Sequence, residues 1–370
     1  MKYENLTYVY KSGRIKRLNG KETYPDEFFY GLNFLSSKFE NTSVIELEEN
    51  KSNYFLKICF NLIRYISGLP FYSEQIISLK NFKILKNSDL VVLTNQGLGF
   101  SALPLILINK LLKKQVSCVF VMGLYNVNTN KKIKLLFRKF FTFIFLKTID
   151  KIIFLSQGEY NFSIQKYSKL ASKFSSLPFC IDTEFWNPCL GKDKLKNNIL
   201  FIGNDGMRDY DFAIELAKSM ENYNFIFVTK KIEKSNLKSN NVELISGFWS
   251  EETLSDMEIK NIYENSLLTI IPIVETLQPS GQSVALQSMS LGVPVIITKT
   301  NGFWEPKKFI DKENIIFVEK NDITQWKNKI NYILSNKEFY EKLSKSAKKT
   351  VSENNNLNLF NENLIKILFN

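Results

Sequence analysis

The sequence predicts an α/β protein built from two parallel-sheet units, and three observations lead to this prediction. A chain of 370 residues has the length of about two domains. Short, nearly continuous apolar runs alternate with amphipathic helical patterns from one end to the other. Strands of this composition are buried on both faces, as in parallel sheets covered by helices. Between residues 178 and 198, two prolines and a charged stretch interrupt the alternation, so we expect the second unit to begin there.

In the first half, the expected strands are runs rich in β-branched and aromatic residues, at 6–10, 43–48, 89–93, 117–121 and 151–156. The expected helices repeat apolar residues every three or four positions, at 28–39, 54–67, 99–113 and 131–147.

The second half continues the same alternation. Its expected strands are 198–203, 225–229, 242–245, 268–271, 293–298 and 315–318. Its expected helices are 209–220, 257–265, 283–291, 323–335 and 337–352. A last segment with helical spacing of apolar residues, 356–369, follows a polar break.

The composition of the chain limits its binding partners and the catalytic groups that it can use. The net charge of +12 favours anionic partners such as nucleic acid, anionic lipid or phosphorylated small molecules, although lysine and asparagine are frequent throughout. The chain contains no histidine, which excludes histidine acid–base catalysis, Ser-His-Asp triads and histidine metal sites. The four cysteines form no C-x-x-C pair, so we expect free thiols in a reducing compartment.

Two further features bear on location. The first six residues are too polar for a secretory signal, and the longest apolar runs, 100–108 and 140–146, are far shorter than the ~20 residues that span a bilayer. We therefore expect a cytoplasmic protein, with peripheral attachment to the inner face of a membrane left open.

The segment 272–296 is the most informative about function. It has the pattern of a strand end, a polar loop, a short helix and another strand. The polar residues around the helix start are Ser280, Gly281, Gln282, Ser283 and, one turn later, Gln287. Free N–H groups and the positive end of the helix dipole make such a start an anion site, most naturally for phosphate. The alternative is an ordinary strand–loop–helix unit without a ligand.

The same segment carries a family resemblance. The run Q-S-M-S-L-G-V-P-V at 287–295 resembles the "E-A-M-A-x-G-x-P-V" signature of GT-B glycosyltransferases of the large retaining family 4. The stretch 178–188 resembles the interdomain sequence "P-x-G-V-D-x-x-x-F-x-P" of these enzymes, with Cys180 in place of the usual glycine. The resemblance covers roughly 150–350, in the order that the family has.

The resemblance implies a GT-B fold with two Rossmann-like domains that face each other across a cleft. Residues 1–185 would form the acceptor domain, which the C-terminal helix 356–370 would rejoin. Residues 186–355 would form the donor domain, which binds a nucleotide-diphosphate sugar.

It also implies donor-binding residues. Ser280, Gly281, Gln282 and Ser283 would hold the diphosphate, and Gln287 stands where the family has a glutamate that binds the donor ribose. An amide can still donate to and accept from hydroxyl groups. Glu275 would hold the transferred sugar and is the candidate catalytic residue, although it lies three residues upstream of the family's carboxylate.

Other donor contacts would come from three strand ends. Arg208, in the glycine-rich turn 201–210, would grip phosphate oxygens with its guanidinium fork. Lys230 would reach a phosphate or sugar oxygen, and Gly247 and Phe248 would contact the base. Solvent-exposed roles for Arg208 and Lys230, and a core role for Phe248, remain as alternatives.

The first domain would contribute acceptor and cleft loops at Gly13, Arg14, Gly97, Gly123 and Tyr125. The last two occupy the place of the family's active-site histidine, which this chain lacks. In a retaining transfer, the donor's own phosphate oxygen can take the acceptor proton, so no protein base is required. The expected activity is therefore metal-independent, cofactor-free transfer of a sugar to a glycan or lipid-linked acceptor. The main alternative is a binding protein on the same fold that transfers nothing, and a phosphorylase or epimerase is a smaller one.

The segment 131–147 carries six basic residues and no acidic one. Its basic residues include Lys131, Lys132, Lys134, Arg138 and Lys139. Basic and aromatic residues at helical spacing suit a helix that lies against an anionic membrane. A helix packed on the sheet with a basic outer face fits equally well. No nucleic-acid-binding module is recognisable, so we expect no nucleic-acid partner.

Overall fold

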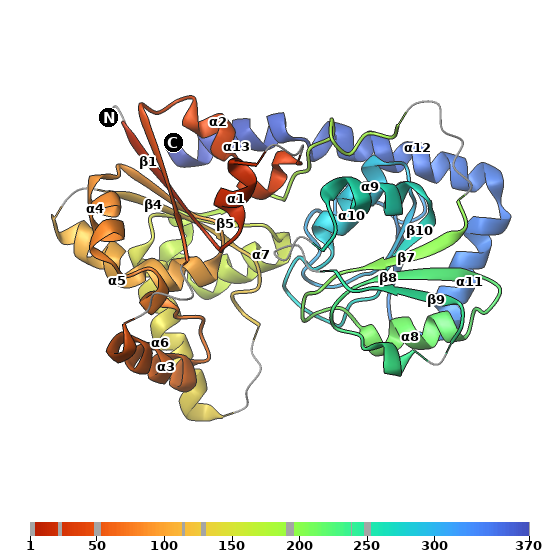
Figure 1. Ribbon diagram of the computed structural model, residues 1–370, viewed down its shortest axis with the longest axis horizontal. Helices are drawn as coiled ribbons and strands as arrows, with labels where there is room; N and C mark the ends of the chain where they lie inside the picture. The colour runs from red at the N-terminus through yellow and green to blue at the C-terminus, as the bar shows by residue number, and fades with distance from the viewer. Residues whose placement is uncertain are drawn as a thin grey trace.

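The computed structural model describes residues 4–20, 24–47, 53–112, 115–126, 131–189, 196–237, 239–247 and 253–369. Among these residues the chain forms two six-stranded sheets in which every neighbouring pair of strands is parallel. The two sheets lie side by side, one in each half of the molecule, with helices over their faces (Figure 1). This is the GT-B architecture of two Rossmann-like α/β domains.

The first sheet has the strand order β2-β1-β3-β4-β5-β6. Its strands are β1 (Asn5–Tyr10), β2 (Asn41–Glu46), β3 (Leu90–Leu93), β4 (Val116–Val121), β5 (Lys151–Phe154) and β6 (Phe174–Ser176). The helices between them are α1 (Arg14–Leu18), η1 (Asp26–Phe29), α2 (Leu32–Ser36), α3 (Tyr54–Ser67), η2 (Ser73–Gln75), α4 (Leu79–Asn87), α5 (Gln96–Leu112), α6 (Lys132–Thr148), α7 (Gln157–Lys166) and η3 (Ser168–Lys173).

The second sheet has the order β12-β11-β10-β7-β8-β9. Its strands are β7 (Asn198–Ile202), β8 (Asn224–Val228), β9 (Val242–Ile245), β10 (Ser266–Ile271), β11 (Val295–Thr298) and β12 (Ile316–Val318). The helices are α8 (Tyr210–Lys218), η4 (Lys234–Asn236), α9 (Asp256–Glu264), α10 (Gln282–Ser290), α11 (Ile323–Ser335), α12 (Lys337–Asn354) and α13 (Leu357–Phe369).

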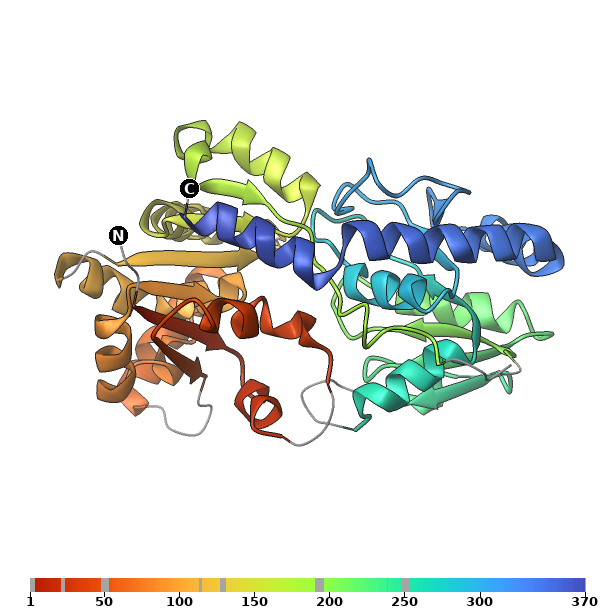
Figure 2. The ribbon, with the colours of Figure 1, turned by 90° about the horizontal axis from the view of Figure 1, so that it is seen from above.

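The last two helices connect the halves. Seen from above, α12 lies along the second domain and α13 continues over the first (Figure 2). Phe360 of α13 stacks on Phe120 of β4, with ring centroids 6.1 Å apart, and Leu364 is fully buried. The final helix therefore completes the core of the first domain from the far end of the chain.

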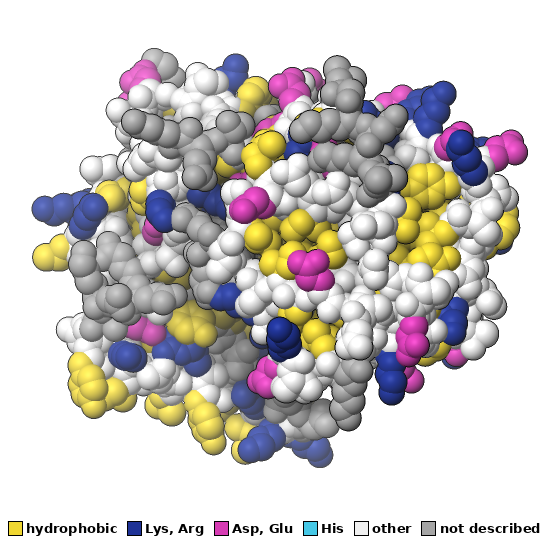
Figure 3. Space-filling model, turned by 45° about the vertical axis from the view of Figure 1, so that its right-hand side comes forward, with side chains coloured by type: hydrophobic (Ala, Val, Ile, Leu, Met, Phe, Trp, Pro, Cys, Tyr) yellow, Lys and Arg dark blue, Asp and Glu magenta, His cyan; other side chains and the backbone are white. Residues whose placement is uncertain are grey.

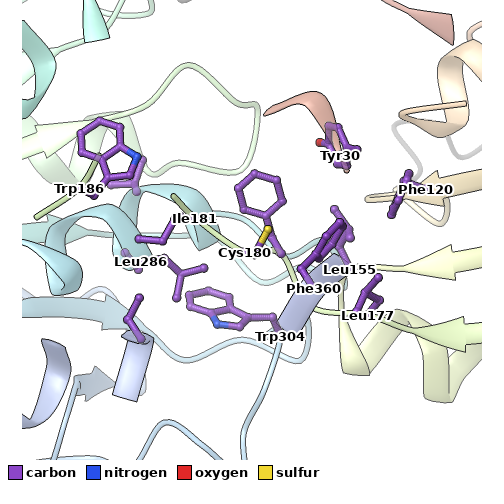
Figure 4. Close-up of a cluster of buried hydrophobic side chains, with 14 of the residues drawn as sticks. Tyr30, Phe120, Leu155, Leu177, Cys180, Ile181, Trp186, Leu286, Trp304 and Phe360 are labelled. Atoms are coloured by element: carbon purple, nitrogen blue, oxygen red, sulfur yellow. The ribbon is translucent and has the colours of Figure 1, made fainter. Parts of the chain in front are cut away.

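A single apolar cluster runs through the junction of the two domains (Figure 4). It joins side chains of the first domain, the linker, the second domain and α13, labelled in Figure 4 as Tyr30, Phe120, Leu155, Leu177, Cys180, Ile181, Trp186, Leu286, Trp304 and Phe360. Trp186 and Trp304 are almost entirely buried there. Such packing favours a defined relative placement of the two domains, because separating them would expose these side chains to water.

One expected helix is wrong in its extent. The periodicity of 28–39 predicted a continuous helix, but the chain forms η1 and then α2, with a break at Tyr30 and Gly31. Both residues have positive φ, 52° and 79°. The turn brings Gly31 against Leu364 of α13, at a place where a Cβ atom would approach to 2.9 Å. Only glycine fits this contact without displacement.

Candidate functional site

The start of α10 lies at the carboxyl end of β10, where open α/β sheets bind ligands. Gly281 forms the N-cap in the left-handed conformation, with φ 81°, and places Ser280 and Gln282 at the mouth of the helix. Both side chains are almost completely buried. Nothing in the described part of the chain hydrogen-bonds Gln282 Nε2, so a buried donor at this helix start remains open for a ligand.

Arg208 reaches this helix start from the loop after β7. Its Nη1 donates to Ser280 Oγ at 2.6 Å and to Asp205 Oδ2 at 2.9 Å, and Ser280 Oγ donates to the same Asp205 oxygen at 2.8 Å. Arg208 is 5% exposed as a residue, and its Nε lacks a partner among the described residues. The sequence singled out both Arg208 and the start of α10 for an anion site, and the structure places the two in contact. It missed Asp205, whose carboxylate occupies the position of an anion between them.

A cavity of about 300 Å³, here called the donor cavity, opens beside this anion site and is lined by both domains. From the second domain it takes Asn204, Gly247, Ser283 and Gln287, and from the first domain Arg14 and Phe28. Asn204 fixes two strand ends, because its Nδ2 donates to Gly247 O at 2.8 Å and its Oδ1 accepts from Lys230 N at 2.7 Å.

Gln287, the expected ribose ligand, lines the donor cavity but is held by other side chains. Its Nε2 donates to Glu27 Oε1 at 3.0 Å, and its Oε1 accepts from Tyr263 Oη at 3.2 Å. Trp186 Nε1 and the Asp182 N–H also donate to the Glu27 carboxylate, at 2.8 and 3.1 Å. The amide is therefore oriented by a carboxylate from the other domain, 260 residues away in sequence.

Glu27 is a residue that the sequence did not single out. Its carboxylate is buried between the domains, and burial raises its pKa from 4.5 to about 7, although the bonds from Gln287, Asp182 and Trp186 oppose the rise. The resemblance places a glutamate at position 287, so this chain keeps a carboxylate in the region but supplies it from η1. No local pattern around residue 27 signals that role.

A second cavity, of about 440 Å³, lies in the first domain and is called here the acceptor cavity. It is lined by Gly97 at the start of α5, Lys11 after β1 and Gln278 of the second domain. Arg14 lines this cavity as well as the donor cavity, so its side chain stands where the two spaces meet. Gly13 precedes it as the left-handed N-cap of α1.

The loop after β4 closes against the second domain, at the place where the resemblance puts the family's histidine. Asn126 Nδ2 donates to Gln278 Oε1 at 2.6 Å, and Thr276 Oγ1 donates to Asn126 Oδ1 at 3.2 Å. Gly123, with φ 94°, lies so close that a Cβ atom would be 2.7 Å from Gln278 Oε1. Its N–H donates to the Glu159 carboxylate at 2.8 Å.

Glu159 is buried beneath this loop at the first turn of α7. Burial raises its pKa from 4.5 to about 7, and the bonds from the backbone of Gly123–Tyr125 oppose the rise. The carboxylate thus anchors the loop. Tyr125 lines neither cavity: its ring packs on Phe162 at 4.7 Å, and its hydroxyl bonds Ser163 Oγ at 2.7 Å.

Two further expected residues, Glu275 and Lys230, stand apart from the cavities. Glu275 is exposed and accepts from the Asn301 N–H at 3.1 Å, and it lines neither cavity. Lys230 is exposed at the end of β8. Phe248 lies outside the described residues.

The basic residues of helix α6 do not all lie on its solvent-exposed face. Its buried residues are Thr142, Phe145 and Leu146. Arg138 is half-buried and donates to the carbonyl oxygens of Leu124 and Asn126 at 2.9 and 2.7 Å. It therefore anchors the loop after β4.

The other basic residues of this helix divide into two groups. Lys131, Lys132 and Lys139 are exposed, while Lys134 is half-buried against Gly68. Within the described segments, no helix is both long and apolar enough to cross a bilayer.

The comparisons with known proteins concern the family and the fold. Residues 182–350 match the family model described as glycosyl transferases group 1. No curated protein matches the chain.

Among solved structures, a glycosyltransferase from Rickettsia africae ESF-5 is 16% identical, with a TM-score of 0.68 over 100% of this chain and 98% of that one. Sucrose-phosphate synthase from Thermosynechococcus elongatus is 12% identical, with a TM-score of 0.68 over 98% of each chain. Anabaena HepE, solved in complex with UDP-glucose, is 10% identical, with a TM-score of 0.69 over 98% of this chain and 99% of that one. Residues 182–350 therefore resemble the glycosyl transferases group 1 family, and the whole chain has the fold of solved GT-B glycosyltransferases.

Proposed function

We propose that this protein is a glycosyltransferase that moves a sugar from a nucleotide-diphosphate donor to a glycan or lipid-linked saccharide, with retention and without a metal ion. The single observation that carries the proposal is the meeting of Arg208, Ser280 and the start of α10 beside a cavity that both domains line. A helix N-terminus and a guanidinium fork are the groups that hold diphosphates in proteins. UDP-glucose is the ligand in the HepE structure of the same fold, which supports a donor of this chemical class.

In this mechanism the diphosphate displaces Asp205 from Arg208 and Ser280. The guanidinium, the Ser280 hydroxyl, the buried Gln282 amide and the N–H groups of α10 then stabilise the charge that develops on the leaving diphosphate. Positive partial charge from the protein supplies the role that a metal ion has in other transferases, which is why we propose metal independence.

The acceptor proton needs a base close to the reacting carbon. The chain has no histidine, and Glu159, the carboxylate beneath the loop after β4, is committed to backbone N–H groups. We therefore assign the proton to a phosphate oxygen of the donor, which lies on the same face of the sugar as the incoming hydroxyl. Attack and departure on one face retain the configuration at the anomeric carbon. The protein contributes position and electrostatic stabilisation.

The test begins with thermal unfolding in the presence of UDP, GDP, ADP and CMP. A ligand at a hundred times its dissociation constant adds about 2.7 kcal/mol of stability, which is readily measured. Arg208→Ala should abolish the shift, whereas Lys218→Ala, which removes an exposed cation of the same domain, should preserve it. The absence of a shift with every nucleotide would contradict the proposal. The anomeric configuration of the product, read by proton NMR, and turnover in EDTA test retention and metal independence separately.

Two neighbouring helices support an acceptor that is presented at a membrane. α3 and α6 pack on each other, and each turns an apolar face to solvent. The exposed apolar residues are Tyr54, Phe55, Ile58, Leu62 and Tyr65 on α3, and Ile133, Leu136, Phe137, Phe140 and Phe143 on α6. Hydrophobic and basic side chains lie together along the lower edge of Figure 3, the level at which α3 and α6 lie in Figure 1.

Exposed apolar side chains beside lysines suit the interface of an anionic membrane. Changing Lys131, Lys132 and Lys139 to glutamate should release the protein from vesicles that contain anionic phospholipid, measured by flotation. Lys83→Glu with Lys86→Glu on α4 is the matched control, because these lysines are also exposed. Equal vesicle binding by all variants would contradict attachment through α6.

A further inference from the structure

The first domain carries a concentration of positive charge that the donor site does not explain. The segment 11–17, directly after β1, reads Lys-Ser-Gly-Arg-Ile-Lys-Arg and contains four basic and no acidic residues. It lies at the carboxyl end of a central strand, so its side chains are available to the cleft. Its members separate by location: Lys11 lines only the acceptor cavity, Arg14 lines both cavities, and Arg17 forms an ion pair with Asp256 of α9.

The acceptor cavity is positive overall. Lys11 and Arg14 are its charged lining residues, and no aspartate or glutamate lines it within the described part of the chain. The amino end of the 17-residue helix α5 also faces it, through Gln96, Gly97 and Leu98, and adds positive partial charge.

Among the described residues, two acidic groups are close in sequence to residues that line this cavity, and both are bonded within the protein. Glu46 accepts from the Ile15 N–H at 2.6 Å, and Glu74 pairs with Arg64 at 2.8 Å. Neither carboxylate lines the cavity.

Arg14 gives a second reason to expect an anion in the acceptor cavity. Burial, and to a smaller extent Arg17, lower its pKa from 12.5 to about 10, while Tyr30, Tyr10 and Glu46 oppose the shift. A guanidinium in these surroundings is stabilised by an anion that enters the cavity beside it.

The remaining lining residues suit a sugar ring. Gln96 is fixed by two bonds to the Met122 backbone, at 2.8 and 3.0 Å, and Asn95 caps the Leu98 N–H at 3.0 Å. Tyr72 offers an aromatic face whose far side carries the Arg64 guanidinium at 4.6 Å from the ring centroid.

We propose that the acceptor cavity binds a saccharide that bears a carboxylate or a phosphate group, and that Lys11 recognises this anion. The assignment rests on the proposed function, because it takes this cavity as the place of the acceptor. A uronic acid and a sugar phosphate share the required chemistry, and the experiment distinguishes them. Lys11 is a specificity residue: it selects the acceptor, whereas the donor groups of Arg208 and Ser280 are unaffected by it.

The test measures binding by titration calorimetry, with the donor site first saturated by whichever nucleoside diphosphate stabilises the protein. The probes are methyl glucoside, methyl glucuronide and glucose 6-phosphate. We expect at least one anionic probe to bind about tenfold or more tightly than methyl glucoside, as a charge-assisted hydrogen bond provides. Lys11→Gln should remove most of this preference, and Lys16→Gln, an exposed lysine of the same segment that lines neither cavity, should retain it.

Equal binding of all three probes, or an unchanged preference in Lys11→Gln, would overturn the proposal. The nucleotide shift is measured in the same samples before any sugar is added. If a nucleotide stabilises the protein but no anionic sugar is preferred, this inference alone is wrong. If no nucleotide stabilises the protein and no anionic sugar is preferred, the proposed function is wrong as well.

Discussion

Replacing Glu27 with glutamine should remove a large part of the pH dependence of stability between pH 5 and 8. Glu27 is completely buried between the domains, and burial raises its pKa from 4.5 to about 7. Glu159, below the loop after β4, is buried to the same extent and its pKa is also raised to about 7. Both carboxyl groups therefore bind a proton more tightly in the folded than in the unfolded protein.

The sign of the effect follows from this difference. Where the folded state binds more protons, the unfolding free energy decreases as pH rises. The decrease begins near pH 4.5, the unfolded value, and ends near pH 7, the folded value. At 1.36 kcal/mol for each pH unit between the two values, each carboxyl group costs about 3 kcal/mol of stability above pH 7 relative to pH 4.

Glutamine has the size of glutamate but does not ionise. Its NH2 group would face at least one of the donors from Trp186, Gln287 and the Asp182 backbone, which costs about 1–3 kcal/mol at every pH. The Glu27→Gln variant should therefore be less stable than wild type at pH 5, and the two should approach each other by pH 8.

Urea unfolding followed by tryptophan fluorescence at pH 5, 6, 7 and 8 measures this, because Trp186 contacts the altered group. Glu159→Gln is the matched control. It should reduce the dependence of the unfolding free energy on pH by a similar amount, although Glu159 lies below the loop after β4 and not between the domains. A wild-type stability that does not fall from pH 5 to 8 would refute the reasoning. So would a Glu27→Gln variant that keeps the full wild-type slope.

Three other predictions concern packing and charge. Gly158→Ala places a Cβ atom 1.8 Å from the carbonyl oxygen of Asn301 in the other domain, so it should lower thermal stability and turnover, while Gly206→Ala, with open space around it, should do neither. Phe145→Ala empties a fully buried ring site in the first domain and should cost about 3–5 kcal/mol in urea unfolding, with a loss below 1 kcal/mol contradicting the packing described. Asp205→Asn removes the carboxylate that competes with phosphate for the same guanidinium, so the nucleoside diphosphate should bind more tightly in calorimetry, and weaker binding would show that the carboxylate assists the ligand.

Several elements could be predicted because their signals are local. The helix 54–67 and the strand 242–245 have the expected bounds, since a run of apolar residues with one period, bounded by polar or glycine residues, specifies its own conformation. The polar helix start at α10 could also be predicted, because Ser280, Gly281 and Gln282 stand between a buried strand and a short helix.

Amphipathic patterns show that a helix has two faces and leave open which one is buried. In α6, Ile133, Phe137 and Phe140 face solvent, while Thr142 is buried and Arg138 bonds the loop after β4. Which face of α6 is buried depends on its packing against neighbouring elements, because the free energy of burial depends on what covers the face.

The sequence by itself determined the two α/β units, and it predicted their junction after residue 178 and an anion site at Arg208 and the start of α10. The tertiary structure decided the groups that meet between the domains: Glu27 with Gln287, and Asn126 with Gln278. These pairs are separated by 260 and 152 residues, and no local pattern links them. Their geometry exists only after both sheets have formed and the apolar cluster at the junction has fixed one domain against the other, because a hydrogen bond requires its two partners to be placed within a fraction of an ångström.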